Sequence, residues 1–130
     1  MTFKCQPIKF NQPCQPISFK SKVKDLFRAG VLPIAKDLYG LPLTRKNVTD
    51  EHIVCKCFGG SNALHNIALA TKKNNNGRGN KPIEKFVTPQ MVDKYLAQFE
   101  GLKIAGFDVG GYVKGIRQTF QKIWSKKKWH

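Results

Sequence analysis

Apolar residues recur at helical spacing near the start of the chain. Between residues 21 and 30, Val23, Leu26 and Phe27 share one face, and basic side chains occupy the others, which predicts a helix. Its basic face either contacts phosphates or is an ordinary solvated face. The next stretch is broken by prolines and a glycine, so we expect at most a short helix, around residues 34–39.

Two further helices are predicted in the C-terminal third. Thr88-Pro89 combines a cap with proline at the first helical position, and an apolar stripe follows that ends before Gly101. The glycine-rich residues 106–111 lack the Lys-Ser/Thr ending of a phosphate loop and predict a turn. The last amphipathic helix is marked by Tyr112, Val113, Ile116, Phe120, Ile123 and Trp124.

The first twenty residues contain a short internal repeat. Residues 5–10 and 14–19 both begin Cys-Gln-Pro-Ile and end in Phe, with apolar and polar positions alternating. This pattern fits a paired binding ribbon or two short extended segments that dock on the core. The second interpretation is favoured, because a proline near each start suits an edge.

A central stretch, residues 50–82, departs from these core-building patterns. It opens with Asp50-Glu51-His52, which we judge too polar for a packed strand, and it contains three consecutive asparagines, which are poor helix formers. Two apolar runs, Ile53-Val54 and residues 67–69, are separated by a glycine turn and predict a two-stranded ribbon.

A helix is expected to follow the second strand of this ribbon. Thr71 is a plausible N-cap, and Gly77 and Gly79 are plausible stops. Such a β-β-α unit would bring Glu51 and His52, at the end of the first strand, beside a helix that carries Asn75. A carboxylate, an imidazole and a carboxamide would then converge.

At these residues the chain resembles the HNH nucleases, the ββα-metal family. His52 matches the first H, Asn66 the N, and Asn75 the last position, where the family accepts His or Asn. Glu51 stands where the family has an acidic metal ligand. The glycine turn at residues 59–60 and the basic residues 78–81 also agree, and the resemblance covers about a third of the chain.

The resemblance implies a mechanism for hydrolysing a phosphodiester bond. His52 would be the general base, since a histidine is mostly neutral at cellular pH and can accept a proton from water. Glu51 and Asn75 would hold one divalent ion, Mg²⁺ or Mn²⁺, and hard cations of this kind prefer oxygen ligands. Asn66 would fix the loop or the orientation of His52. Asp50 is either a spare ligand or a strand-end residue.

The family's bracing zinc site is not expected in this chain. Its second cysteine pair would fall on Thr71 and Asn74, which supply no thiolate, so the resemblance implies the zinc-free type. We expect four free thiols, although a zinc site that uses all four stays open. They are Cys5, Cys14, Cys55 and Cys57.

Charge points to an anionic partner. Lysine and arginine outnumber aspartate and glutamate 23 to 8, which gives a net charge of +15 and a pI near 10. Nucleic acid is favoured, DNA before RNA. A membrane is disfavoured, because no apolar run approaches a spanning length and no signal peptide is visible, so a cytoplasmic location is expected. The expected phosphate-binding residues are Lys72, Lys73, Arg78, Lys81, Lys114, Arg117, Lys122, Lys126, Lys127 and Lys128.

These observations predict a small α+β protein that acts as a metal-dependent endonuclease, as a monomer or homodimer. Residues 1–130 would form one domain, with extended segments and short helices in 1–47, the ββα core in 48–83, and two helices with a basic tail in 84–130. The main alternative is a non-catalytic nucleic-acid-binding or regulatory module on the same fold. A zinc-binding adaptor is a third, weaker possibility.

Overall fold

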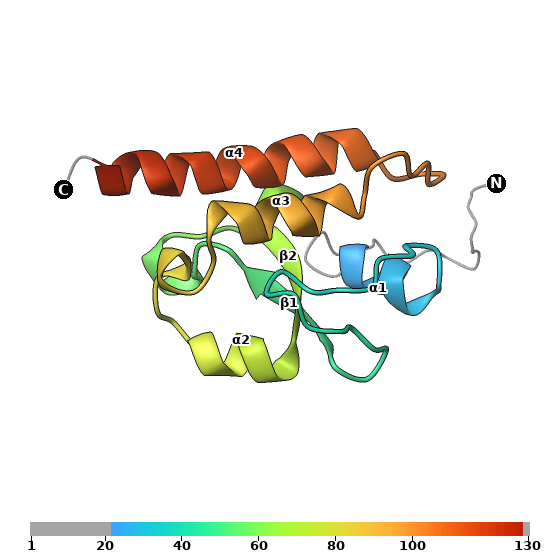
Figure 1. The fold of residues 1–130 in the computed structure, drawn as a ribbon, viewed down its shortest axis with the longest axis horizontal. Coiled ribbons are helices and arrows are strands. Elements are labelled where there is room, and N and C mark those ends of the chain that lie inside the picture. Colours follow the sequence, from blue (N-terminus) through green and yellow to red (C-terminus); the bar gives the residue numbers. More distant parts are fainter. Residues whose placement is uncertain (1–21, 129–130) are drawn as a thin grey trace.

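The computed structural model describes residues 22–128. In this part of the chain the protein is α+β, with a two-stranded antiparallel hairpin packed against four helices (Figure 1). The strands are β1 (Val48–His52) and β2 (Ile67–Thr71), and the α-helices are α1 (Lys22–Arg28), α2 (Lys72–Arg78), α3 (Pro89–Ala97) and α4 (Val109–Lys128). Short 3₁₀ turns are η2 (Lys56–Phe58), η3 (Leu64–Asn66) and η4 (Ile83–Lys85).

The hairpin confirms the predicted second strand and shifts the first. Val48 pairs with Thr71 and His52 with Ile67, so β1 ends just before Ile53-Val54, where we expected the strand. Asp50-Glu51-His52 therefore form the end of β1, as we expected for Glu51 and His52, although we judged the three-residue run too polar for a packed strand. They are tolerated because each of the three has a polar partner.

Helices cover both edges of the hairpin. α3 and α4 lie side by side next to β2, and α2 lies on the opposite side, next to β1 (Figure 1). Aromatic rings join the two C-terminal helices: the ring centroid of Phe99 lies 5.3 Å from those of both Tyr95, in an edge-on contact, and Tyr112, in a tilted one. The large side chains that are fully buried include Leu32, Leu38, Ile53, Ile67, Leu69, Ile83, Tyr95, Phe99, Ile116 and Phe120.

The outer edge of β2 is bonded to tyrosine hydroxyls. Tyr112 donates its hydroxyl hydrogen to the Ile67 carbonyl at 2.7 Å, and the Leu69 amide donates to the Tyr95 hydroxyl at 3.0 Å. The two hydroxyls also bond to each other at 3.1 Å. Burial raises the pKa of both tyrosines, that of Tyr95 to about 12, so both hydroxyls stay protonated.

The outer edge of β1 is bonded to side chains of α2. The Asn75 amide donates to the Asp50 carbonyl at 3.1 Å, and the Arg78 guanidinium donates to the His52 carbonyl at 2.6 Å. Asn75 and Arg78 are three residues apart and so share one helix face. That face fixes how α2 sits against β1.

No helix forms at residues 34–39, where we expected at most a short one. The carboxylate of Asp37 instead accepts hydrogen bonds from the amides of Tyr39 and Leu41, which closes a turn. Its other oxygen accepts from the amide of Thr71 and the side chain of Asn74, which ties the turn to the start of α2. Asx-type turns of this kind compete with helix formation.

The other helices follow the sequence pattern closely. Thr71 and Thr88 both cap the helix that follows, and α2 ends at its C-cap Gly79, with Gly77 inside the helix. α4 begins at Val109, three residues before the expected start, so the predicted glycine-rich turn is shorter than 106–111. Within residues 22–128, no helix is both long and apolar enough to cross a membrane. The N-terminal repeat lies outside the described residues.

Candidate functional site

His52, the last residue of β1, is half-buried and bonded to the loop that follows. Its Nε2 lies 2.9 Å from Oδ1 of Asn62. A carboxamide oxygen can only accept, so Nε2 carries a proton, and in the neutral ring Nδ1 keeps the lone pair. Asn62 therefore orients His52 and leaves one ring nitrogen able to accept a proton. Sequence reasoning missed Asn62, because it occupies no motif position.

The side chain of Asn66 holds this loop in place through hydrogen bonds to its backbone. Its oxygen accepts from the Val54 amide at 2.8 Å, and its nitrogen donates to the carbonyls of Val54 at 3.0 Å and Ser61 at 2.8 Å. The Ile53 amide also donates to the Asn66 carbonyl. Of the two roles expected for Asn66, the contacts match fixing the loop. Orientation of His52 falls to Asn62.

Glu51 points away from solvent, toward α2. Its side chain is 0% exposed, and Oε2 lies 2.6 Å from Nη1 of Arg78 and 2.8 Å from the hydroxyl of Tyr39. Burial raises the pKa of the Glu51 carboxyl, and the hydrogen bonds from Arg78 and Tyr39 counteract that rise. Burial and the Glu51 carboxylate raise the pKa of Tyr39, so this hydroxyl remains a donor.

Two oxygens in this region have the chemistry that a hard divalent ion requires. Oε1 of Glu51 is buried and has no hydrogen-bond partner among the described residues. The Asn75 amide nitrogen is used on Thr49 and the Asp50 carbonyl, so its oxygen is the part left for a ligand. These two donors fit Mg²⁺ or Mn²⁺ by type. Access for an ion from solvent fits less well, because the Glu51 side chain is fully buried.

Arg78 does not fit the phosphate-binding role predicted for it. Its side chain is 3% exposed, and its guanidinium bonds to Glu51 and to the carbonyls of His52, Ile53 and Lys81. A guanidinium with all of its nitrogens engaged has no donor left for a phosphate. Arg78 is instead the cation that holds β1, the loop and α2 together.

Most of the other predicted phosphate-binding residues are on the surface. Arg117 forms an exposed ion pair with Asp93 at 2.6 Å, so its charge is partly offset. The exposed lysines are Lys72, Lys73, Lys81, Lys114, Lys122 and Lys126. α4 extends through Lys127 and Lys128, whose side chains lie outside the described part.

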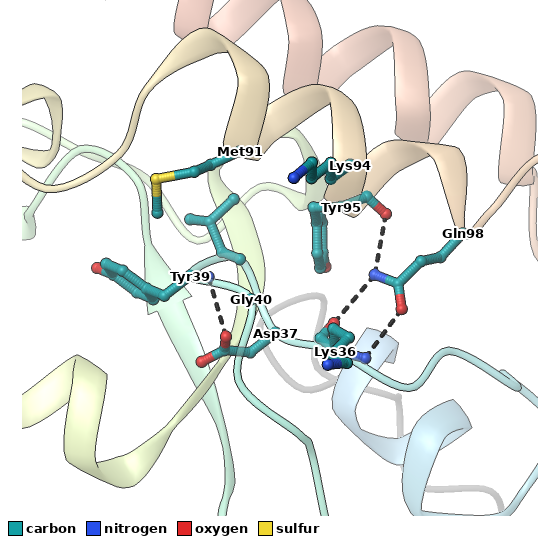
Figure 2. A pocket seen from close by; sticks show the side chains of 9 residues that line it. Lys36, Asp37, Tyr39, Gly40, Met91, Lys94, Tyr95 and Gln98 are labelled. Carbon is teal, nitrogen blue, oxygen red and sulfur yellow. Dashed lines mark hydrogen bonds between the residues drawn. The ribbon is translucent and has the colours of Figure 1, made fainter.

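Tyr39, whose hydroxyl bonds to Glu51, also lines a surface hollow of about 370 Å³, and Figure 2 shows the residues around this hollow. Among the polar residues that line the hollow, Gln98 is already hydrogen-bonded to other parts of the protein. The Gln98 oxygen accepts from the amide of Lys36, and its nitrogen donates to the carbonyls of Lys36 and Tyr95, as Figure 2 shows. Glu51 is not among the residues that line this hollow.

Other titratable residues near the motif have structural partners. Asp50 lies 3.8 Å from Lys24 of α1, and the Cβ of His65 packs against Gly115 of α4. Cys55 and Cys57 are free thiols, and burial raises the pKa of Cys55. Across residues 22–128, no three His, Cys, Asp or Glu side chains gather as a metal site.

Comparison with known proteins gives no further assignment. No family model, curated protein or solved structure matches this chain.

Proposed function

We propose that the chain is a metal-dependent endonuclease of HNH type, built on a ββα-metal unit made of β1, β2 and α2, that hydrolyses phosphodiester bonds of nucleic acid, with DNA favoured. One observation supports this most: His52 ends β1 with a lone pair on Nδ1 and its other nitrogen held by Asn62. A histidine fixed in one tautomer is what a general base requires.

The chain's own residues then divide the work. His52 accepts the proton of the attacking water at Nδ1, and Asn62 stabilises the resulting imidazolium by accepting from Nε2. Asn66 keeps the loop at the distance that the Asn62 contact needs. When bound, Mg²⁺ or Mn²⁺ would neutralise charge that develops on the phosphate, with Glu51 and Asn75 as its protein ligands.

A second candidate function, nucleic-acid binding without cleavage, is favoured by the Glu51 contacts. Its carboxylate is already neutralised by Arg78 and covered by Tyr39. Both contacts are to Oε2, and Oε1 is buried, so an ion can reach Oε1 only if the packing around Glu51 opens. The surface lysines would bind phosphates equally well in either function.

The two functions are separated by His52→Ala assayed on supercoiled plasmid with Mg²⁺ and with Mn²⁺. We expect cleavage to fall about a hundred- to ten-thousand-fold, the usual contribution of a general base. Binding, measured in Ca²⁺, should change little, because the surface lysines supply the charge that attracts phosphates. A parent protein that cuts nothing with either ion, or a His52 variant that cuts normally, leaves the binding module as the function.

The metal is tested in the same assay by Asn75→Ala, with Asn76→Ala as the matched control. Asn76 is the exposed neighbour on α2, and its side chain forms no hydrogen bond within residues 22–128. Asn75→Ala should weaken cleavage, and excess metal should partly restore it, whereas Asn76→Ala should cut like the parent. Metal rescue of His52→Ala is not expected, because the lost group is the base.

A further inference from the structure

Phe58 is an exposed aromatic residue in a hollow rather than on a flat surface. Its side chain is 63% exposed, and it lies in η2, just after β1. The hollow has a volume of about 490 Å³, and its apolar walls come from Ile53, Ile83 and Ile123. A ring that lies in an apolar recess and keeps one side in solvent is suited to bind another flat apolar group.

A second hollow, of about 240 Å³, adjoins the first. Both are lined by Val54, Ile123 and Lys126, so these residues form the wall between them. The second hollow lies between the loop around Ser61 and α4, and the loop also carries Asn62, the partner of His52. The loop that lines the second hollow is thus also the loop whose Asn62 bonds to the candidate general base.

The charges around the two hollows are mainly positive. Lys122 and Lys126, one helical turn apart on α4, line the second hollow, and Lys85 and Lys126 line the first. Glu84 is the single acidic residue that lines either of them, and no ion pair within residues 22–128 involves these three lysines. A ligand with an anionic part and a flat apolar part fits this pair of hollows.

The α4 side of this region is held rigidly in place. The Thr119 hydroxyl donates to the His65 carbonyl at 2.6 Å, and Gly115 lets the helix approach the Cβ of His65. Asn66 fixes the opposite wall through Val54 and Ser61. Both walls are therefore set before a ligand arrives, which lowers the entropic cost of binding.

We propose that these two hollows hold one unpaired nucleotide beside the cleavage site, with its base stacked on Phe58 and its phosphate bound by Lys122 and Lys126. In a duplex, neighbouring bases cover both faces of each base, so a protein ring can stack only on an unpaired one. The substrate is therefore single-stranded nucleic acid, or a junction with an unpaired nucleotide. This inference rests on the proposed nucleic-acid function.

Binding is tested without cleavage, in chelator, using a fluorescein-labelled single-stranded oligonucleotide and the duplex of the same sequence. The parent should prefer the single strand. Phe58→Ala should lose about 5- to 100-fold of single-strand affinity, the range usual for one aromatic stack, and approach duplex affinity. Leu41→Ala, at another exposed apolar residue, serves as the control and should bind like the parent.

Stacking itself is read from the fluorescence of 2-aminopurine placed in the single strand. Phe58→Tyr keeps the ring and should keep the fluorescence quenching, whereas Phe58→Leu keeps apolar bulk and should lose it. The inference is overturned if the parent binds the duplex as tightly as the single strand, or if Phe58→Leu quenches normally. It is also overturned if the parent is a dimer that Phe58→Ala dissociates, because the ring would then be covered by a second copy.

The same measurements on His52→Ala keep this inference apart from the proposed activity. His52→Ala should bind and quench like the parent, whatever its cleavage. Normal quenching with a parent that never cuts would retain the nucleotide site and remove the nuclease. If the parent cuts nucleic acid but does not quench the fluorescence, the nuclease activity is retained and the nucleotide site is removed.

Discussion

A single arginine links the strand, the loop and the helix of the central unit. Arg78 forms a buried ion pair with Glu51 and donates to three backbone carbonyls. Removing charges from water is costly, so such a pair contributes less net stability than its short distance suggests. Removing Arg78 alone should be strongly destabilising, because the Glu51 carboxylate left behind would be buried and unpaired.

We therefore expect Arg78→Met to lower the free energy of unfolding by roughly 3–5 kcal/mol, measured by urea denaturation. Arg117→Met is the matched control, because Arg117 pairs with Asp93 at the same 2.6 Å on the surface. It should cost no more than about 1 kcal/mol. Glu51→Gln added to Arg78→Met should restore part of the loss. Equal effects of the two single variants would contradict this account of Arg78.

For single residues, the sequence predicted which residue types the site contains better than it predicted where their side chains point. Glu51, His52, Asn66 and Asn75 lie in the predicted strand–strand–helix order. Alternation along β1 puts Glu51 and His52 on opposite sides of the strand, and only the fold shows which side is buried. Arg78 looks like a surface cation at a helix end until the carbonyls around it are seen.

The elements are joined through a close contact between η3 and α4. A Cβ built on Gly115 would lie 2.9 Å from the Cβ of His65, too close for two carbon atoms. The absence of a side chain at Gly115 is thus what allows the Thr119 hydroxyl to reach the His65 carbonyl. This contact holds α4 against the loop that carries Asn62.

Gly115→Ala and Gly110→Ala should change stability in opposite directions. Both are glycines of α4, and alanine in a helix is normally favoured by roughly 0.5–1 kcal/mol. At Gly110 a new Cβ meets only Asp108, at 3.8 Å, so that gain should appear. At Gly115 the clash should outweigh it and lower the melting temperature. Stabilisation by both substitutions would show that the contact is loose.

Local signals explain which elements were predictable. The threonine caps and apolar stripes that mark the helices are short-range features, so α1, α3 and α4 appear close to where the pattern puts them. The turn at residues 34–39 was missed because Asp37 bonds to Thr71 and Asn74, far along the chain. A strand as polar as β1 likewise depends on partners that no local pattern reveals.

On the scale of the whole molecule, a net charge of +15 sets the strength of any association with a polyanion. Counterions released from nucleic acid make such binding fall steeply with salt. Among the exposed lysines, Lys72 and Lys73 lie on α2, and Lys114, Lys122 and Lys126 lie on α4; these two helices cover opposite edges of the hairpin (Figure 1). The anionic partner is therefore expected to contact more than one side of the molecule.

The slope of log affinity against log salt should report these contacts one by one. Lys122→Gln should lower its magnitude by about one unit, because one phosphate contact is lost. Arg117→Gln should lower it less, since Asp93 already offsets that charge. Binding to labelled DNA between low and physiological salt measures both. Identical slopes for parent and Lys122→Gln would exclude Lys122 from the interface.

The bonded edges of the hairpin have a consequence for self-association. Exposed strand edges are templates for intermolecular sheets and lead to aggregation. Here tyrosine hydroxyls engage Ile67 and Leu69 on one edge, and side chains of α2 engage Asp50 and His52 on the other. A hairpin this short gains most of its order from such neighbours. The same contacts that hold the candidate site in place also protect its strands from amyloid-like growth.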